Sequence, residues 1–267
     1  MKKTMPLLVL SLLFLLLFTT CTHENDNQQV ILNAVKDVDG NIYDAVRIGE
    51  QVWMKTNLRT KHFRNGSEIS KGDAETNSMT DAYYYEPNTT ELPNHDSKTY
   101  GLYYNWSAAI DNRGICPKGW HVPSHEEWVE LQEYVSDKSE YLYNNKPKSI
   151  AKALATKTGW KSSDEEGTPG LLSKLNNATG FSAFPTGLWI HGWSFQNGVE
   201  HGSFVYDGEI AFFWSSTSMN SVFEPMGCEI DYDENEIKLS VAYDGVYWVW
   251  DGIEPEDGGT IRCVRDK

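Results

Sequence analysis

The sequence is poor in basic residues. It has 23 lysines and arginines against 38 aspartates and glutamates, which gives a formal net charge of −15 at pH 7. It contains no basic run and no arginine-rich stripe, so most of its surface would repel a polyanion. We therefore expect no nucleic-acid partner. An acidic composition of this kind is typical of a well-hydrated surface.

Long apolar runs and common catalytic motifs are also missing. The extended apolar stretch at residues 6–18 is too short to span a bilayer comfortably. The chain has no Gly-x-Ser-x-Gly and no His-Glu-x-x-His, and its seven histidines are not spaced like zinc ligands. A glycosidase needs two carboxylates facing each other across a cleft, and sequence alone cannot identify such a pair among 38 acids. These absences favour a protein that is not an enzyme.

The N-terminus has the pattern of a signal peptide over residues 1–20. Basic residues come first, an apolar segment follows, and small residues precede Cys21. The segment Phe18-Thr19-Thr20 resembles the relaxed lipoprotein cleavage boxes of Bacteroidetes-type bacteria. We expect lipidation of Cys21, a polar tether over 21–34, and a location in the outer membrane, exposed at the cell surface and held by the lipid anchor alone. Secretion with a free Cys21 is the alternative.

Residues 35–267 are expected to form a single domain. With ten tryptophans, 14 tyrosines and 10 phenylalanines, and few amphipathic periods, they favour strands and loops. Short alternating runs around two turns predict a hairpin over 31–53. Residues 65–99 read as a long loop, and strand-and-turn patterns return from residue 180 onward.

Two helices interrupt this pattern. Ser124 and Glu127 form a capping box, and Trp128, Leu131 and Val135 then fall on one face of a helix that ends near Val135. A second helix is expected around residues 150–158, among several alanines. Helices placed between an opening hairpin and closing strands imply an α+β fold.

Six motifs together resemble the Fibrobacter succinogenes major paralogous domain, a family of secreted and lipoprotein modules. They are Ile48-Gly49-x-Gln51-x-Trp53-Met54-x-x-Asn57-Leu58, Tyr100-Gly101-x-x-Tyr104-Asn105-Trp106, Cys116-Pro117-x-Gly119-Trp120-His121-x-Pro123, Gly180-Phe181-Ser182-Ala183-x-Pro185-x-Gly187, Phe213-Trp214-Ser215-Ser216-Thr217 and Arg262-Cys263-Val264-Arg265-Asp266. The third and last motifs are also distantly similar to the C-type-lectin-like fold of formylglycine-generating enzymes. That similarity implies a twisted antiparallel sheet with two helices and long loops that carry binding.

The cysteines agree with this resemblance. In an exported chain, Cys116 and Cys263 would form a disulfide that closes a loop of roughly 150 residues and stabilises the fold by roughly 4 to 5 kcal/mol. Cys228 is then left as a buried free thiol, although its pairing with either of the others stays open. The redox or copper chemistry of formylglycine-generating enzymes needs further cysteines near the C-terminus, which this chain lacks. Within its motif, His121 is expected to form hydrogen bonds in the core rather than act as a base.

No cofactor is expected, with calcium as the alternative to test. Asp231, Asp233 and Asn235 place oxygen ligands at alternate positions, as calcium loops do, but the glycine that bends such loops is missing. A solvated acidic turn is the favoured interpretation. The Asp37–Asn41 segment is interpreted as a turn, and the lectin-like Glu86-Pro87-Asn88 as a coincidence.

Aromatic residues of the C-terminal half are the candidates for ligand binding. Flat rings bind sugar faces and protein edges well, although a role in the core is the competing interpretation. The candidates are Trp189, Trp193, Tyr243, Tyr247, Trp248 and Trp250. We expect a non-catalytic cell-surface module that recognises a glycan or a surface protein. The alternatives are an assembly component of a surface appendage or outer-membrane complex, and an uncharacterised enzyme.

Overall fold

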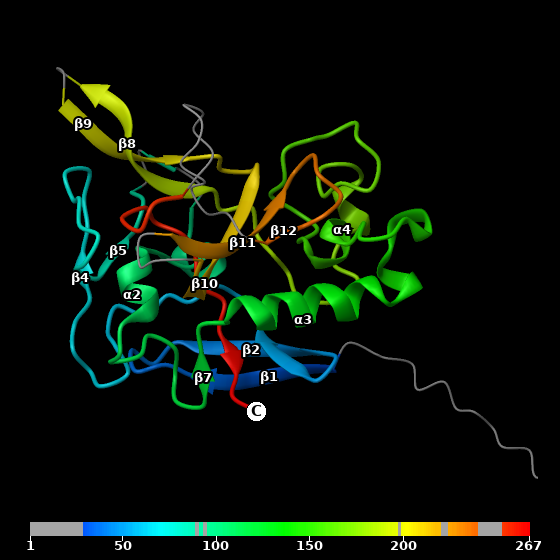
Figure 1. Cartoon of the computed structure of the whole chain (residues 1–267), viewed down its shortest axis with the longest axis horizontal. Helices are drawn as coiled ribbons and strands as arrows, with labels where there is room; N and C mark the ends of the chain where they lie inside the picture. Colours follow the sequence, from blue (N-terminus) through cyan, green and yellow to red (C-terminus); the bar gives the residue numbers. More distant parts are fainter. Residues whose placement is uncertain (1–28, 89–90, 93–94, 197–198, 220–223, 240–252) are drawn as a thin grey trace, which may run out of the picture.

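The computed structural model describes residues 29–88, 91–92, 95–196, 199–219, 224–239 and 253–267. Within them the protein is a mixed α+β fold with mainly antiparallel sheets and few helices (Figure 1). The predicted opening hairpin is present. It begins at Gln29, six residues before the expected domain start, because the first strand takes up part of the expected tether.

The largest sheet joins the two ends of the described chain. Its order is β1-β2-β3-β13-β7, with antiparallel neighbours, and its strands are Gln29–Lys36, Ile42–Ile48, Gln51–Met54, Val264–Arg265 and Trp120–His121. The late strand β13 therefore lies between β3 and β7. At this junction Val264 of β13 pairs with Trp53 of β3 on one side and with His121 of β7 on the other.

Three smaller sheets complete the strands. One contains β10 Ile210–Ser218, β11 Pro225–Asp231 and β12 Lys238–Leu239; β8 Leu188–Gln196 and β9 Val199–Val205 form a two-stranded ribbon; and β4 Ser70–Lys71, β5 Tyr83–Tyr85 and β6 Tyr103–Tyr104 form the last. Strand β4 runs parallel to β5. Strands β4 and β5 and the helical turn α1, Ser97–Tyr100, interrupt the expected loop over 65–99.

Helix α3, His125–Ser136, is the long helix of the described chain, and it confirms the predicted capping box. The Glu127 amide donates to Ser124 Oγ at 3.2 Å, and the Ser124 amide donates to the Glu127 carboxylate at 2.9 Å. Its apolar face is buried as expected, with Trp128, Leu131 and Val135 in the core.

The remaining helices are short. They are α1 Ser97–Tyr100, α2 Trp106–Ile110, α4 Ala151–Leu154 and the 3₁₀ turns Ser139–Tyr141, Tyr143–Asn145 and Ser173–Leu175. The second predicted helix thus forms a single turn. It ends early because Ala155 is extended and the Thr156 amide donates to the Ala183 carbonyl instead of to the helix.

The core lies on both faces of the β1–β3 sheet, because successive strand residues point to opposite sides. Tyr43 and Ala45 belong to one cluster, whereas Val46 and Trp53 belong to the other, beneath α3. Trp53 and Trp128 place their ring centres 4.6 Å apart in this second cluster. Truncating a ring as deeply buried as Trp128 costs about 3 to 5 kcal/mol.

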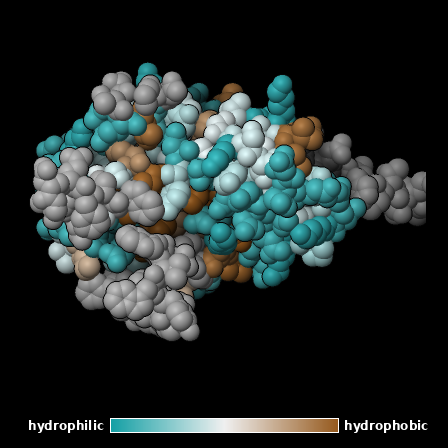
Figure 2. Space-filling view, turned by 90° about the horizontal axis from the view of Figure 1, so that it is seen from above, coloured by the Kyte–Doolittle hydropathy of each residue, from teal (hydrophilic) through white to brown (hydrophobic). Residues whose placement is uncertain are grey.

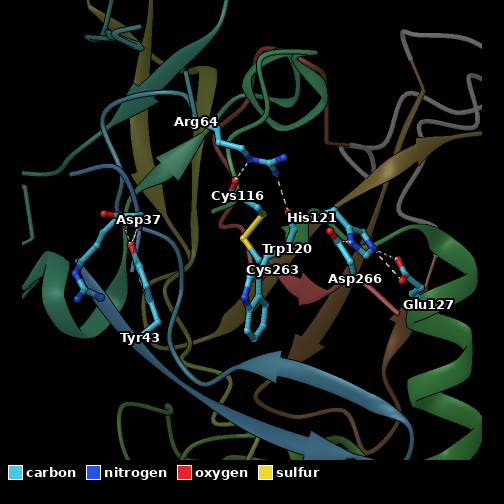
Figure 3. Close-up of a disulfide and its surroundings, with 10 residues drawn as sticks. Asp37, Tyr43, Arg64, Cys116, Trp120, His121, Glu127, Cys263 and Asp266 are labelled. Carbon is cyan, nitrogen blue, oxygen red and sulfur yellow. Dashed lines mark hydrogen bonds and ion pairs between the residues drawn. A yellow bond between two sulfur atoms is a disulfide. The ribbon is translucent and has the colours of Figure 1, made fainter. Parts of the chain in front are cut away.

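The disulfide between Cys116 and Cys263 is present, with Cα atoms 6.1 Å apart (Figure 3). It ties the segment before α3 to the last strand. Cys228 is free and buried, so the alternative pairings do not occur. Within the described residues, no helix is long and apolar enough to cross a membrane.

Candidate functional site

Residues that the sequence marked as binding candidates are only partly described. Cys21, Tyr243, Tyr247, Trp248 and Trp250 lie outside the described residues. Trp193 belongs to β8, but its side chain also lies outside that part of the structure.

Trp189 can be placed, and its ring lies in the core. It is 3% exposed and stacks on Tyr85, with ring centres 3.8 Å apart and planes 11° apart. The two rings form a small core cluster with Tyr103. Trp189 therefore packs the β8–β9 ribbon onto β5 instead of offering its face to a ligand.

The acidic turn at Asp231 also has its own partners. The Lys238 ammonium lies 3.2 Å from the Glu229 carboxylate and 3.9 Å from that of Asp231. Burial, together with the neighbouring Asp233, raises the pKa of Asp231 to about 6. Asn235 contributes its carbonyl to the Ala151 amide. Among the described residues, no group of three or more His, Cys, Asp or Glu side chains could hold a metal ion.

A second acidic turn, residues 254–257, follows the C-terminal aromatic segment directly. The Asp257 carboxylate accepts the amides of His191 at 3.0 Å and Glu254 at 2.9 Å. Burial raises the pKa of Asp257 to about 7, and its two backbone hydrogen bonds offset only part of that effect. Tyr85 donates its hydroxyl to the Glu256 carbonyl at 3.3 Å. The turn therefore anchors residues 253–257 in the core.

Three aromatic side chains meet at the surface beside this region, and we call them the Tyr100 group: His95, Tyr100 and Phe184. The ring centres of His95 and Tyr100 are 4.0 Å apart, and those of Tyr100 and Phe184 are 5.4 Å apart. All three residues are half-buried, which leaves part of each ring accessible. The buried Tyr103 hydroxyl lies 3.3 Å from His95 Nε2 and donates to the Thr186 carbonyl.

Backbone geometry holds this group in place. Gly101 adopts a φ of +85°, and a Cβ there would lie 2.5 Å from the Asn57 Cβ and 2.8 Å from the Leu58 carbonyl oxygen. Only glycine fits such a position. The tight fit fixes Tyr100 at the end of α1, whose first turn is capped by Asp96.

The charges of two exposed carboxylates, Asp96 and Asp207, act on Tyr100. Burial, followed by the charges of Asp207 and Asp96, raises the pKa of Tyr100. Partial desolvation raises the pKa of Asp207. Burial lowers the pKa of His95 to about 4, so its imidazole is neutral near pH 7. The result is a neutral aromatic surface with carboxylate acceptors at its edge.

His121 is the centre of a separate ionic cluster, shown in Figure 3. Its Nδ1 lies 2.7 Å from the Asp266 carboxylate and its Nε2 lies 2.9 Å from that of Glu127. The bond to Glu127, then the bond to Asp266, raises the pKa of His121 against the effect of burial. Both ring nitrogens are thus occupied. This confirms the hydrogen-bonding role, but the expected place in the core is wrong, because the His121 side chain is 39% exposed. The side chain links β7, α3 and the chain end beside a hollow of about 120 Å³.

Sequence reasoning missed the Tyr100 group. Tyr100 is the first residue of a family motif, but His95 lies in the segment that the sequence predicts as a long loop. Phe184 occupies a position that the motif leaves open. Only the fold brings these two segments together, through the Tyr100–Phe184 ring contact and the hydrogen bond from the Tyr103 hydroxyl to the Thr186 carbonyl.

The fold and its sites define a disulfide-bonded α+β domain with a half-buried aromatic group at its surface. The chain belongs to the Fibrobacter succinogenes major domain family, whose sequence model matches residues 46–265. No curated protein and no solved structure matches the chain.

Proposed function

We propose that this chain is a cell-surface lipoprotein whose domain binds a glycan without catalysing a reaction. The observation that carries the proposal is the Tyr100 group, in which half-buried rings from two segments meet near the charges of two exposed carboxylates. Aromatic faces pack against the C–H faces of sugars, because they offer a large area at low entropic cost. Carboxylates at the edge can accept hydrogen bonds from sugar hydroxyls.

Charge narrows the class of glycan. Asp96 and Asp207 lie beside the rings, and the whole chain has a formal charge of −15. An acidic sugar would be repelled by both. We therefore favour a neutral saccharide. Figure 2 views the domain from above, where β8 and β9 lie, and shows hydrophobic residues reaching the surface among hydrophilic ones.

The states of three groups that could serve in catalysis, His95 beside the rings and His121 and Cys228 elsewhere, argue for binding rather than catalysis. Neutral His95 is held by Tyr103, and its lowered pKa makes it a weak base. His121 has a carboxylate on each ring nitrogen. Burial raises the pKa of Cys228 well above its usual value, which makes the thiol unreactive.

We further propose the C-type-lectin-like arrangement as the finer description of the fold, supported by the disulfide that joins the segment before α3 to the last strand. The proposed location is the outer membrane. There, residues 1–20 act as the signal peptide and Cys21 carries the lipid that holds the domain at the cell surface. A surface protein, including one in an assembly, is the alternative ligand.

A glycan array screened with residues 22–267, with and without calcium, tests the proposal. We expect hits among neutral glycans that are lost in both Tyr100→Ala and Phe184→Ala. Tyr143→Ala, a half-buried tyrosine in a 3₁₀ turn, is the matched control and should leave binding unchanged. An array with no hits, given a folded protein, would reject glycan recognition in favour of a protein partner. Loss of binding in Trp248→Ala alone would place the site in the C-terminal aromatic segment.

A further inference from the structure

The β1–β2 hairpin exposes apolar side chains along its length. Val30 is 37% exposed, Leu32 71%, Val38 50% and Ile42 51%. These are four of the nine large hydrophobic residues that the structure describes as exposed. Single exposed apolar residues are normal, but several on one hairpin indicate an interaction surface.

Strand geometry places members of this set on the same side. Val30 pairs with Val46, and Ile42 lies four residues before Val46 on β2, so both point to the same face of the sheet. Helix α3 covers this face at Val46, whereas Val30 and Ile42 stay exposed beside it. Leu32 follows Val30 by two residues and lies at the start of a register shift between Ile31 and Val35. We call Val30, Leu32 and Ile42, with Val38 in the adjoining turn, the hairpin patch.

The bulge makes a second copy of the chain a poor occupant of this edge. Asn33 adopts a φ of +49°, and its amide donates to the Asp44 carboxylate at 2.8 Å, within the same hairpin. A bulge of this kind twists an edge strand and interrupts the regular spacing that a new strand would need for pairing. Side chains rather than backbone groups are therefore the accessible feature of β1.

The length of the preceding chain points to a membrane. If Cys21 carries a lipid, as the proposed function requires, only seven residues separate it from Gln29, the first residue of β1. Seven residues span at most about 25 Å when fully extended. The hairpin patch would thus be held close to the lipid surface at all times.

The hairpin itself, residues 29–48, contains two basic and three acidic residues, a formal charge of −1. The exposed Lys36 pairs directly with Ile42. Its ammonium would lie beside the patch, where it can contact the headgroups of anionic lipids.

We propose that the hairpin patch rests on the membrane that holds the lipid anchor, with Leu32 and Ile42 in the interfacial region. This second contact would orient the domain. Figure 1 shows β8 and β9 on the opposite side from β1 and β2, so the ribbon next to the Tyr100 group would point away from the membrane.

The test uses the full lipid-anchored chain in vesicles of phosphatidylcholine and phosphatidylglycerol. A polarity-sensitive dye is attached in Leu32→Cys and, as a control, in Leu172→Cys, which has a similar exposed fraction of 67%. The native Cys228 is buried and the other two described cysteines form the disulfide. We expect a blue shift at position 32, quenching by nitroxide lipids there, and neither effect at position 172.

Each other outcome rejects part of the proposal. If the chain floats with vesicles but the two dyes behave alike, the membrane contact is wrong and the anchor stands. If the chain does not float, the anchor itself is wrong. The same dye can be measured without vesicles. If it is then shielded from an aqueous quencher, and the protein has twice the mass of one chain, the patch binds a second copy instead. A second pair of variants, Leu32→Glu and Leu172→Glu, tests the same contact through the rate of release from vesicles. We expect faster release for Leu32→Glu and an unchanged rate for Leu172→Glu.

Discussion

Arg262 and Asn57 are joined by two hydrogen bonds in the interior, from Nε at 3.0 Å and Nη2 at 2.7 Å to the same Asn57 Oδ1. Both residues are almost completely buried, and no described carboxylate forms an ion pair with Arg262. Its other donors reach the carbonyls of Met54, Phe181 and Ser182. A buried cation thus binds carbonyl oxygens from several segments at once.

Asn57→Ala should lower the free energy of unfolding by about 3 kcal/mol, because it leaves charged donors of Arg262 without a partner in the core. Chemical denaturation measures the change. Asn65→Ala is the control, since that side chain is exposed and contacts only Ser67, and it should change stability by less than about 0.5 kcal/mol. Equal effects of the two variants would contradict the buried network.

Removing the disulfide should lower stability by about 5 kcal/mol, because the bond closes a loop with a sequence separation of 147. The double variant Cys116→Ser with Cys263→Ser tests this in denaturant, compared with Cys228→Ala, which leaves the bond intact. Both sulfur atoms belong to nearly fully buried residues. Reductant alone should therefore act only after partial unfolding, and rapid reduction of the native protein would be inconsistent with this burial.

The His121 cluster should make stability depend on pH. Its raised pKa means that folding favours the protonated ring. This contribution is present below the unfolded pKa of about 6.5 and is lost as pH rises through the higher folded value. His121→Ala should cost about 1 kcal/mol below that range, a modest value because the side chain is partly exposed, and much less at alkaline pH. Thermal unfolding across pH measures this, with His125→Ala as control.

The Asp257 carboxyl should also make the stability of the fold depend on pH, up to the neutral range. Its folded pKa of about 7 lies above the ordinary value of 3.8, so the folded chain takes up a proton first and stability falls as pH rises between these values. Asp257→Asn should flatten the stability profile in this window. Because the Asp257 carboxylate contacts the ribbon that carries Trp189, tryptophan fluorescence should follow the same transition. A midpoint near pH 4 would show that the carboxyl is hydrated.

Sequence could predict the features that depend on neighbours in the chain or on a strong pairing rule. The capping box at Ser124 and Glu127 is local, and it appears as expected. The disulfide followed from an exported chain and a family resemblance. The opening hairpin followed from alternation and turns, which its strands now match.

Sequence could not predict the features that depend on distant contacts. The alanines at 151–155 favour a longer helix, but the Thr156 amide bonds with Ala183 instead. Trp189 could equally be a surface ring or a core ring, and its stacking on Tyr85, far away in the sequence, decides for the core. For the same reason, His95, Tyr100 and Phe184 could not be recognised as one group.

The place of β13 between β3 and β7 has a consequence for biogenesis. A chain that emerges from its N-terminus cannot complete this sheet until residues 264–265 have appeared, because the central strand is almost the last to arrive. Until then β3 and β7 lack their shared neighbour, and Cys116 lacks its native partner Cys263. The sheet can therefore close only after the whole domain has been exported. A chain that ends early would keep open sheet edges, which a protease can recognise.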